Sequence, residues 1–182
     1  DSMAVSTVSM FVATLDTFLD DRKSFLFSYA DLTKIREETV LQPIGWFFLG
    51  TNIAYIISGL FVALSSGDKA VAGVSIELAG LISFIYHFLQ IRLGPNRIEV
   101  RRSLLVDYLG AFSAGILCSL DMLSFLMNVP LGFITQTGGV LVLALTSLAT
   151  LVRSAMFYEK DQCLEYVFWH SLWHFLSALT AY

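Results

Sequence analysis

The three histidines of the chain are spaced so that they could act together. His170 and His174 are four residues apart in the segment F-W-H-S-L-W-H-F-L, and His87 follows Ser83 by the same interval. Residues four apart lie on one face of a helix, so each interval pairs two polar side chains in an otherwise apolar stretch. Neutral imidazoles are frequent zinc ligands, and two at this spacing provide two ligands from one rigid helix.

The helices that carry these side chains are expected to cross a membrane. Of the 182 residues, 56% are hydrophobic and 14% are charged, whereas soluble domains average about 25% charged residues. Five apolar stretches are long enough to cross about 30 Å of hydrocarbon as helices: they cover residues 44–64, 71–92, 103–127, 131–153 and 163–182. The sequence therefore predicts an all-α membrane protein with about five transmembrane helices over residues 44–182. Because the connections are short, successive helices are expected to be antiparallel neighbours.

Asp107 adds a carboxylate to the histidines at the same depth in the membrane. Helical rise places Asp107, His87 and His170 roughly 6–10 Å below one membrane face. Ser83 and His174 lie about one turn deeper on the same helices. Ionisable residues inside a membrane-spanning segment are costly and usually functional. The sequence therefore predicts that these five side chains, from three helices, converge on one site.

A zinc ion accounts for this set of residue types. Three protein ligands plus one water is the usual arrangement in catalytic zinc sites. The glutamate of the H-E-x-x-H motif is absent, so Asp107 is the candidate general base. The alternative interpretation is a metal-free cluster of hydrogen-bonded polar side chains.

Residues 1–43 are predicted to form a separate N-terminal segment. Residues 24–42 mix aromatic and charged side chains, so this segment is either an amphipathic helix on the membrane surface or a cytoplasmic arm. Ten of the 11 Lys and Arg residues fall on the side of the N-terminus, and only Lys69 falls on the other side. By the positive-inside rule, the N-terminus faces the cytoplasm or its organellar equivalent, and the C-terminus faces the opposite side. The net charge of −4, with no basic block, argues against a nucleic-acid partner.

Three short motifs resemble those of the CREST superfamily of membrane hydrolases. This group includes the alkaline ceramidases, the progestin and adipoQ receptors and the myomaker-like proteins. The matching segments are S-F-I-Y-H at 83–87, V-D-Y at 106–108 and F-W-H-S-L-W-H at 168–174. The aromatic-rich third segment is most similar to the myomaker-like branch.

The resemblance implies a role for each residue of the predicted site. By similarity, His87, His170 and His174 would hold Zn²⁺, Asp107 would contact the metal or its water, and Ser83 would lie beside that water and stabilise an oxyanion. The family has seven spans, whereas 63 residues separate Asp107 from His170, about half the family interval. Two spans are therefore expected to be missing, and loss of a pair keeps the last helix entering from the required face.

Two functions remain open from the sequence. The first is a zinc-dependent integral-membrane hydrolase of lipid amide or ester bonds, with membrane lipids as its partners. The second is a non-catalytic accessory subunit of a larger membrane complex, because the loops are short and no soluble domain is present in the sequence. A metal among the histidines would favour the first function, and partner chains around a metal-free bundle would favour the second.

Overall fold

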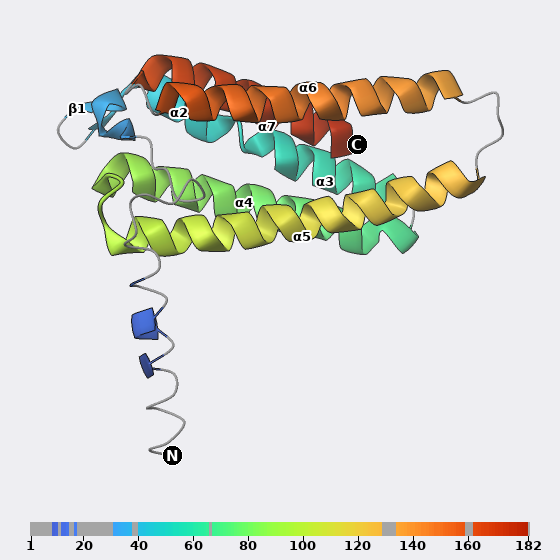
Figure 1. Ribbon diagram of the computed structural model, residues 1–182, viewed down its shortest axis with the longest axis horizontal. Helices are drawn as coiled ribbons and strands as arrows, with labels where there is room; N and C mark the ends of the chain where they lie inside the picture. Colours follow the sequence, from blue (N-terminus) through green and yellow to red (C-terminus); the bar gives the residue numbers. More distant parts are fainter. Residues whose placement is uncertain are drawn as a thin grey trace.

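The computed structural model describes residues 9–10, 12–14, 17, 31–37, 40–65, 67–128, 134–158 and 162–181. Over these residues the chain is an all-α bundle, as predicted (Figure 1). The elements are the 3-10 helix η2 (Leu32–Ile35), strands β1 (Arg36–Glu37) and β2 (Val40–Leu41), helices α2 (Pro43–Gly50) and α3 (Ile53–Ser65), the 3-10 helix η3 (Gly67–Lys69), and helices α4 (Ala70–Leu93), α5 (Ile98–Asn128), α6 (Ile134–Tyr158) and α7 (Cys163–Ala181). The strands pair as a short antiparallel hairpin in which Arg36 lies opposite Leu41.

The predicted N-terminal segment is only partly described. Most of residues 1–30 lie outside the described residues, so the choice between a surface helix and a cytoplasmic arm is not decided there. From residue 31 onward the chain forms η2 and the β1–β2 hairpin instead of a regular α-helix. Leu32 and Ile35 of η2 are buried, so this stretch packs into the bundle.

The first predicted span is broken into two helices, which differs from the continuous helix expected over residues 44–64. α2 stops at Gly50 and α3 starts at Ile53, with a turn at Thr51 and Asn52 between them. The Thr51 hydroxyl donates to the carbonyl oxygen of Phe48 at 2.6 Å, and the Asn52 side-chain amide donates to that of Leu49 at 3.1 Å. Such side chains compete with the backbone for helix carbonyls, which explains why the helix is interrupted here.

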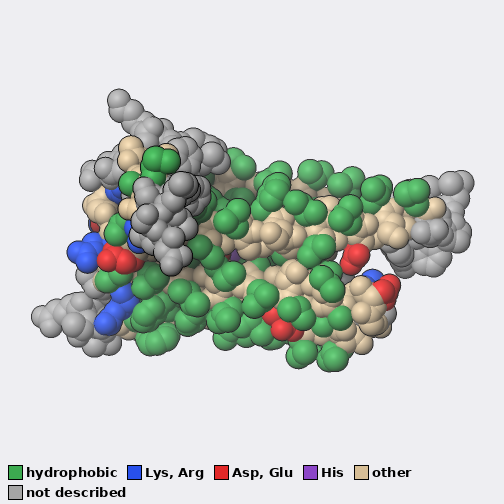
Figure 2. Space-filling view, turned by 90° about the horizontal axis from the view of Figure 1, so that it is seen from below, with side chains coloured by type: hydrophobic (Ala, Val, Ile, Leu, Met, Phe, Trp, Pro, Cys, Tyr) green, Lys and Arg blue, Asp and Glu red, His purple; other side chains and the backbone are tan. Residues whose placement is uncertain are grey.

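Four helical segments are long and apolar enough to cross a membrane. They are Pro43–Ser65, Gly67–Leu93, Ile98–Ser124 and Gly138–Phe157. The fifth predicted span forms the helix α7, but α7 is not among these four segments, because two histidines and two tryptophans lower its hydropathy. Large apolar side chains remain exposed on the outer surfaces of all these helices, and Figure 2 shows them along the length of the bundle.

The helices pack in the spatial order α5, α4, α3, α7, α6. Extensive contacts join α3 to α4, α4 to α5 and α6 to α7, and α3 also packs on α7. By contrast, α5 and α6 follow one another in the chain but make almost no contact, and they lie on opposite sides of the molecule in Figure 1. The expectation that successive helices are neighbours is therefore wrong for this pair. The bundle is open between α5 and α6 because α3 and α7 hold the two halves together.

Two glycines allow α3 and α4 to approach closely. A Cβ atom on Gly73 would lie 2.4 Å from the backbone nitrogen of Ala63 and 2.5 Å from the carbonyl oxygen of Gly59. A Cβ atom on Gly59 would in turn lie 2.5 Å from the Gly73 carbonyl oxygen. Since these neighbours are backbone atoms, a larger residue would push the helices apart. Small residues at such crossings are typical of helix packing in membranes.

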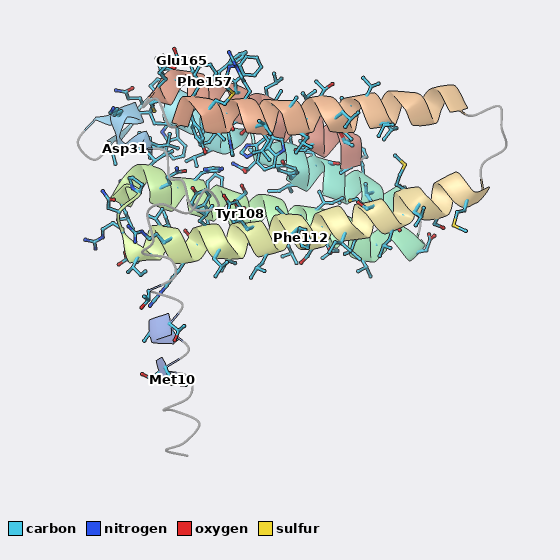
Figure 3. The ribbon with its side chains drawn as sticks, in the orientation of Figure 1. Met10, Asp31, Tyr108, Phe112, Phe157 and Glu165 are labelled. Atoms are coloured by element: carbon cyan, nitrogen blue, oxygen red, sulfur yellow. The ribbon has the colours of Figure 1, made fainter. Side chains whose placement is uncertain are left out.

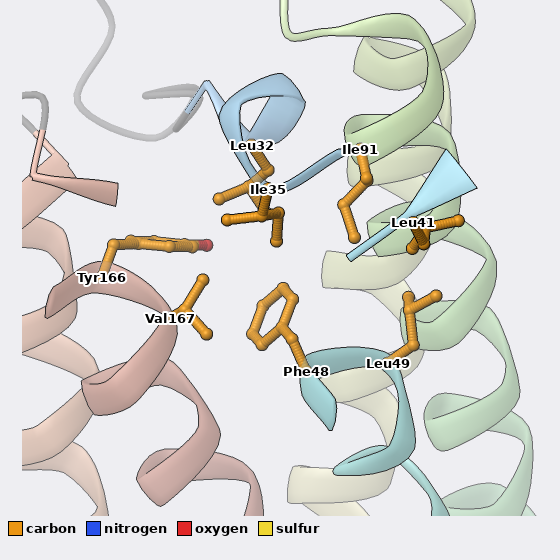
Figure 4. Packing of buried hydrophobic residues seen from close by; sticks show 8 residues of the cluster. All are labelled: Leu32, Ile35, Leu41, Phe48, Leu49, Ile91, Tyr166 and Val167. Carbon is orange, nitrogen blue, oxygen red and sulfur yellow. The ribbon is translucent and has the colours of Figure 1, made fainter. Parts of the chain in front are cut away.

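One end of the bundle is closed by a cluster of buried apolar side chains. Figure 4 shows this end cluster, in which η2 and β2 pack against α2, α4 and α7; its residues are Leu32, Ile35, Leu41, Phe48, Leu49, Ile91, Tyr166 and Val167. Lys and Arg side chains gather mainly at the same end of the molecule in Figure 2, and the exposed ones there include Lys34, Arg92, Arg97 and Arg102.

Candidate metal centre

The three histidines meet in the interior of the bundle. His87 comes from α4, and His170 and His174 come from successive turns of α7. The relative exposure is 0% for His87, 9% for His170 and 0% for His174. One potential ligand atom from each imidazole lies within 4.8 Å of the other two. The convergence predicted for the histidines is therefore confirmed, and the group could hold a metal ion.

Each imidazole makes a hydrogen bond through its Nδ1 atom. The partners are the Thr51 hydroxyl for His174 at 2.7 Å, the Gln90 side-chain oxygen for His87 at 3.0 Å, and the Ser154 hydroxyl for His170 at 3.3 Å. Metal-bound histidines usually have such a partner on the nitrogen that does not bind the metal, since the partner orients the ring.

The partners also determine which ring nitrogen carries the proton. The Thr51 and Ser154 hydroxyls already donate to the carbonyl oxygens of Phe48 and Leu151, so they can only accept from an imidazole N–H. Nδ1 of His174 and of His170 is therefore protonated, and the lone pair of each ring is on Nε2. The side-chain oxygen of Gln90 is likewise an acceptor, which assigns the same tautomer to His87.

Two of the three remaining imidazole nitrogens lack protein partners among the described residues. Nε2 of His87 and Nε2 of His174 are buried and have no hydrogen-bond partner among the described residues. Buried polar atoms are rarely left unpaired in proteins, because an unpaired one costs roughly 1–3 kcal/mol. A metal ion would satisfy these lone pairs together, so the residues present fit a bound cation.

Aromatic side chains surround the histidines. The Phe48 ring contacts all three imidazoles, with centroid distances of 4.6 Å to His87, 5.7 Å to His170 and 5.9 Å to His174. Phe48 belongs to the end cluster, which closes the bundle beyond the histidines. Trp173 packs on His170 at 4.9 Å. The site is therefore shielded from water at the end of the molecule where the basic side chains gather.

Ser83, which is four residues before His87 on α4, pairs with Asp107 of α5. Asp107 is 8% exposed, and the Ser83 hydroxyl forms a hydrogen bond with its carboxyl group. Asp107 is not part of the close three-histidine group, so the five predicted residues divide into a ligand group and a neighbouring polar pair. Both Ser83 and Asp107 line a cavity, and so does Trp173 next to the histidines.

This cavity has a volume of about 620 Å³ and lies between α5 and α6. The residues near the histidines include polar ones, namely Tyr55, Ser83, Asp107 and Ser177, and the wall then follows α5 as far as Leu123. On α5 this wall consists mostly of small side chains. The cavity opens to the outside where α5 and α6 separate, because several of these wall residues are exposed, namely Ala111, Gly115, Ser119 and Leu123. Phe112 is 70% exposed on the outer surface of the same helix (Figure 3).

Sequence reasoning missed Thr51, Gln90 and Ser154. Gln90 is three residues after His87 on the same helix, which is a signal that spacing could have revealed. Thr51 and Asn52 are adjacent polar residues in the middle of an apolar span, but their contact with α7 depends on the helix break. Ser154 lies near the end of α6, and nothing in its local sequence distinguishes it from other serines.

No family model matches this chain, and neither the curated proteins nor the solved structures contain a match. The resemblance to the CREST superfamily therefore depends on the short motifs and on the residues of the site.

Proposed function

We propose that this protein is a zinc-dependent integral-membrane hydrolase of lipid amide or ester bonds, related to the CREST superfamily. The observation that carries the proposal is the convergence of three buried imidazoles, each hydrogen-bonded through Nδ1, in which Nε2 of His87 and of His174 has no protein partner among the described residues. Three neutral nitrogen ligands without a thiolate match the ligand sets of catalytic zinc sites.

The chemistry assigned to the neighbouring side chains follows from their types. Bound Zn²⁺ would polarise a substrate carbonyl and activate a water molecule. The Asp107 carboxylate accepts a proton from the attacking water and returns it to the departing amine or alkoxide as the C–N or C–O bond breaks. Once Asp107 holds the proton, its carboxyl O–H can donate to the Ser83 oxygen, and the Ser83 hydroxyl then donates to the oxyanion that develops on the carbonyl oxygen.

The cavity supports a lipid substrate. Its volume of about 620 Å³ is in the range of small-molecule sites, and its wall is mainly apolar away from the polar pair. Along α5 it runs from Asp107 to Leu123, which corresponds to about 24 Å at the rise of an α-helix. An acyl chain would lie along this wall with its carbonyl group near Asp107. The end cluster blocks entry from the basic end, whereas the separation of α5 from α6 favours entry from the bilayer.

The distribution of basic residues supports the orientation expected from the sequence. Basic side chains gather at the end of the bundle where α4 stops and α5 begins, as Figure 2 shows. In our proposal this end faces the cytoplasm or its organellar equivalent. The histidines then lie nearer the inner face of the membrane, and the C-terminal end of α7 points toward the opposite face.

Replacement of one ligand tests the proposal. Purified His170→Ala protein in lipid nanodiscs should lose bound zinc and lose hydrolysis of N-acyl amide and acyl ester lipids together, because a zinc ligand is removed. Zinc is measured by elemental analysis and released fatty acid by mass spectrometry. The control is Phe168→Ala on the same helix, at a position that is 60% exposed and should change neither quantity. A His170→Ala protein that keeps its zinc would remove His170 from the site.

A non-catalytic accessory subunit is the second candidate, and one observation favours it. The apolar segments of α5 and α6 have only 17% of their residues buried, compared with 39% and 44% for the first two segments. Helices of a partner protein could cover these surfaces. A zinc-free protein that stays bound to defined partner chains after mild solubilisation, without lipid hydrolysis, would support this function.

A further inference from the structure

Thr51 connects the helix break in the first span to the histidine group. It lies in the turn between α2 and α3, is 1% exposed, and contacts a residue of α7 that is 123 positions later in the chain. Its hydroxyl donates to the Phe48 carbonyl oxygen at 2.6 Å and accepts from Nδ1 of His174 at 2.7 Å. A continuous helix would place the Thr51 side chain differently, so the contact with His174 depends on the helix break.

We infer that Thr51 is a positioning residue that sets the tautomer and ring orientation of His174, and thereby the affinity of the site for zinc. This inference rests on the proposed function, because it needs a metal at the three histidines. The Thr51 hydroxyl donates in one contact and must therefore accept in the other. It thus keeps the proton of His174 on Nδ1 and points the Nε2 lone pair toward the three-histidine group.

The contact of Thr51 differs from those of the other two partners. At 2.7 Å it is the shortest of the three imidazole contacts, compared with 3.0 Å for Gln90 and 3.3 Å for Ser154. Gln90 is on the same helix as its histidine, whereas Thr51 reaches His174 across a helix interface. With both groups buried, water cannot easily replace the hydroxyl, so its loss would leave a buried N–H unpaired.

The test compares a substitution that keeps the shape of Thr51 with one that keeps its hydroxyl. Thr51→Val keeps the shape but removes the hydroxyl, and Thr51→Ser keeps the hydroxyl. We expect Thr51→Val to weaken zinc binding about 10–100-fold, which is typical for loss of a partner of a metal-bound histidine. Thr51→Ser should restore the wild-type affinity. Zinc affinity is measured by competition with a chelator on the full chain in nanodiscs.

Two control variants separate positioning from general packing. Ser58→Ala removes a hydrogen bond of 2.7 Å from α3 to the carbonyl oxygen of Ala178 on α7, but touches no imidazole. Thr146→Val makes the same chemical change at an exposed position of α6, where the hydroxyl bonds only within its own helix. Both controls should bind zinc like the wild type. If Thr51→Val does not fold, Thr51→Ala is measured in its place.

The outcomes distinguish this inference from the proposed function. Wild-type zinc affinity in Thr51→Val would overturn the role of Thr51 while leaving the metal site in place. Equal weakening in Ser58→Ala would also overturn it, because α3–α7 packing would then explain the effect. If the wild type itself binds no zinc, the proposed function fails first.

Discussion

The histidines could be identified from sequence at the scale of single residues, whereas their hydrogen-bond partners could not. The four-residue interval between His170 and His174 is local, so helical geometry alone puts both imidazoles on one face. The contact of His174 with Thr51 depends on how α2, α3 and α7 cross, which no interval in the sequence encodes. The sequence also predicted that Asp107 joins the histidines, but in the structure Asp107 pairs with Ser83 and is not part of the three-histidine group.

A substitution of Asp107 tests the division between ligands and the polar pair. Asp107→Asn keeps the size of the side chain and can still form a hydrogen bond with Ser83, but it removes the base. We therefore expect the rate of lipid hydrolysis to fall by about 10²–10⁴-fold. Zinc content should remain that of the wild type, because Asp107 is outside the three-histidine group. Parallel assays of released fatty acid and of zinc on the same sample check this. Loss of zinc in Asp107→Asn would instead make Asp107 a ligand.

At the scale of helices, apolar length predicted four of the five segments in agreement with the described structure, whereas α7 is a helix that is not apolar enough to count as a span. The predicted spans at 71–92 and 103–127 correspond to α4 and α5, which are uninterrupted. The span at 44–64 is interrupted at Thr51 and Asn52, where side-chain and i→i+3 backbone donors share the carbonyl oxygens of the preceding turn. Hydropathy cannot reveal this break, since two polar residues barely change the average over a 20-residue window.

The close approach of α3 and α4 makes a stability prediction. Gly73→Ala would place a Cβ atom 2.4 Å from the Ala63 backbone nitrogen, so the helices must separate. Overpacking of this kind costs about 1–3 kcal/mol, which outweighs the gain of up to about 1 kcal/mol in helix propensity. We therefore expect a lower Tm, measured by intrinsic fluorescence in detergent. Gly139→Ala, where nothing lies within 4 Å of the added Cβ, should keep or raise the Tm.

At the scale of the whole molecule, the open side between α5 and α6 could not be predicted from the sequence. Short connections favour neighbouring helices, and that rule holds for α3 with α4, α4 with α5 and α6 with α7. It fails for α5 and α6 because α3 and α7 pack between the two halves of the bundle. The resulting cavity runs from Ser83 and Asp107 along α5, and in our proposal it is the route by which a lipid enters from the bilayer.

Filling this cavity should affect the substrate and not the metal. Gly115 lines the cavity, and nothing lies within 4 Å of a Cβ atom placed on it, so the side chain of Gly115→Phe starts in open space next to the cavity. We expect a higher KM for lipid substrates with unchanged zinc content, because the ring occupies space needed by the acyl chain. Gly139→Phe, at an exposed position of α6 outside the cavity, is the matched control. An unaltered KM in Gly115→Phe would exclude the cavity as the substrate site.

The most direct measurement of the central claim is X-ray absorption at the zinc edge of the purified protein. The three histidines should give nitrogen ligands at about 2.0–2.1 Å, together with one oxygen ligand from water. A protein that stays free of zinc when equilibrated with excess metal would contradict the claim. So would a zinc spectrum dominated by sulfur at about 2.3 Å, because the metal would then be bound by cysteine and not by the imidazoles.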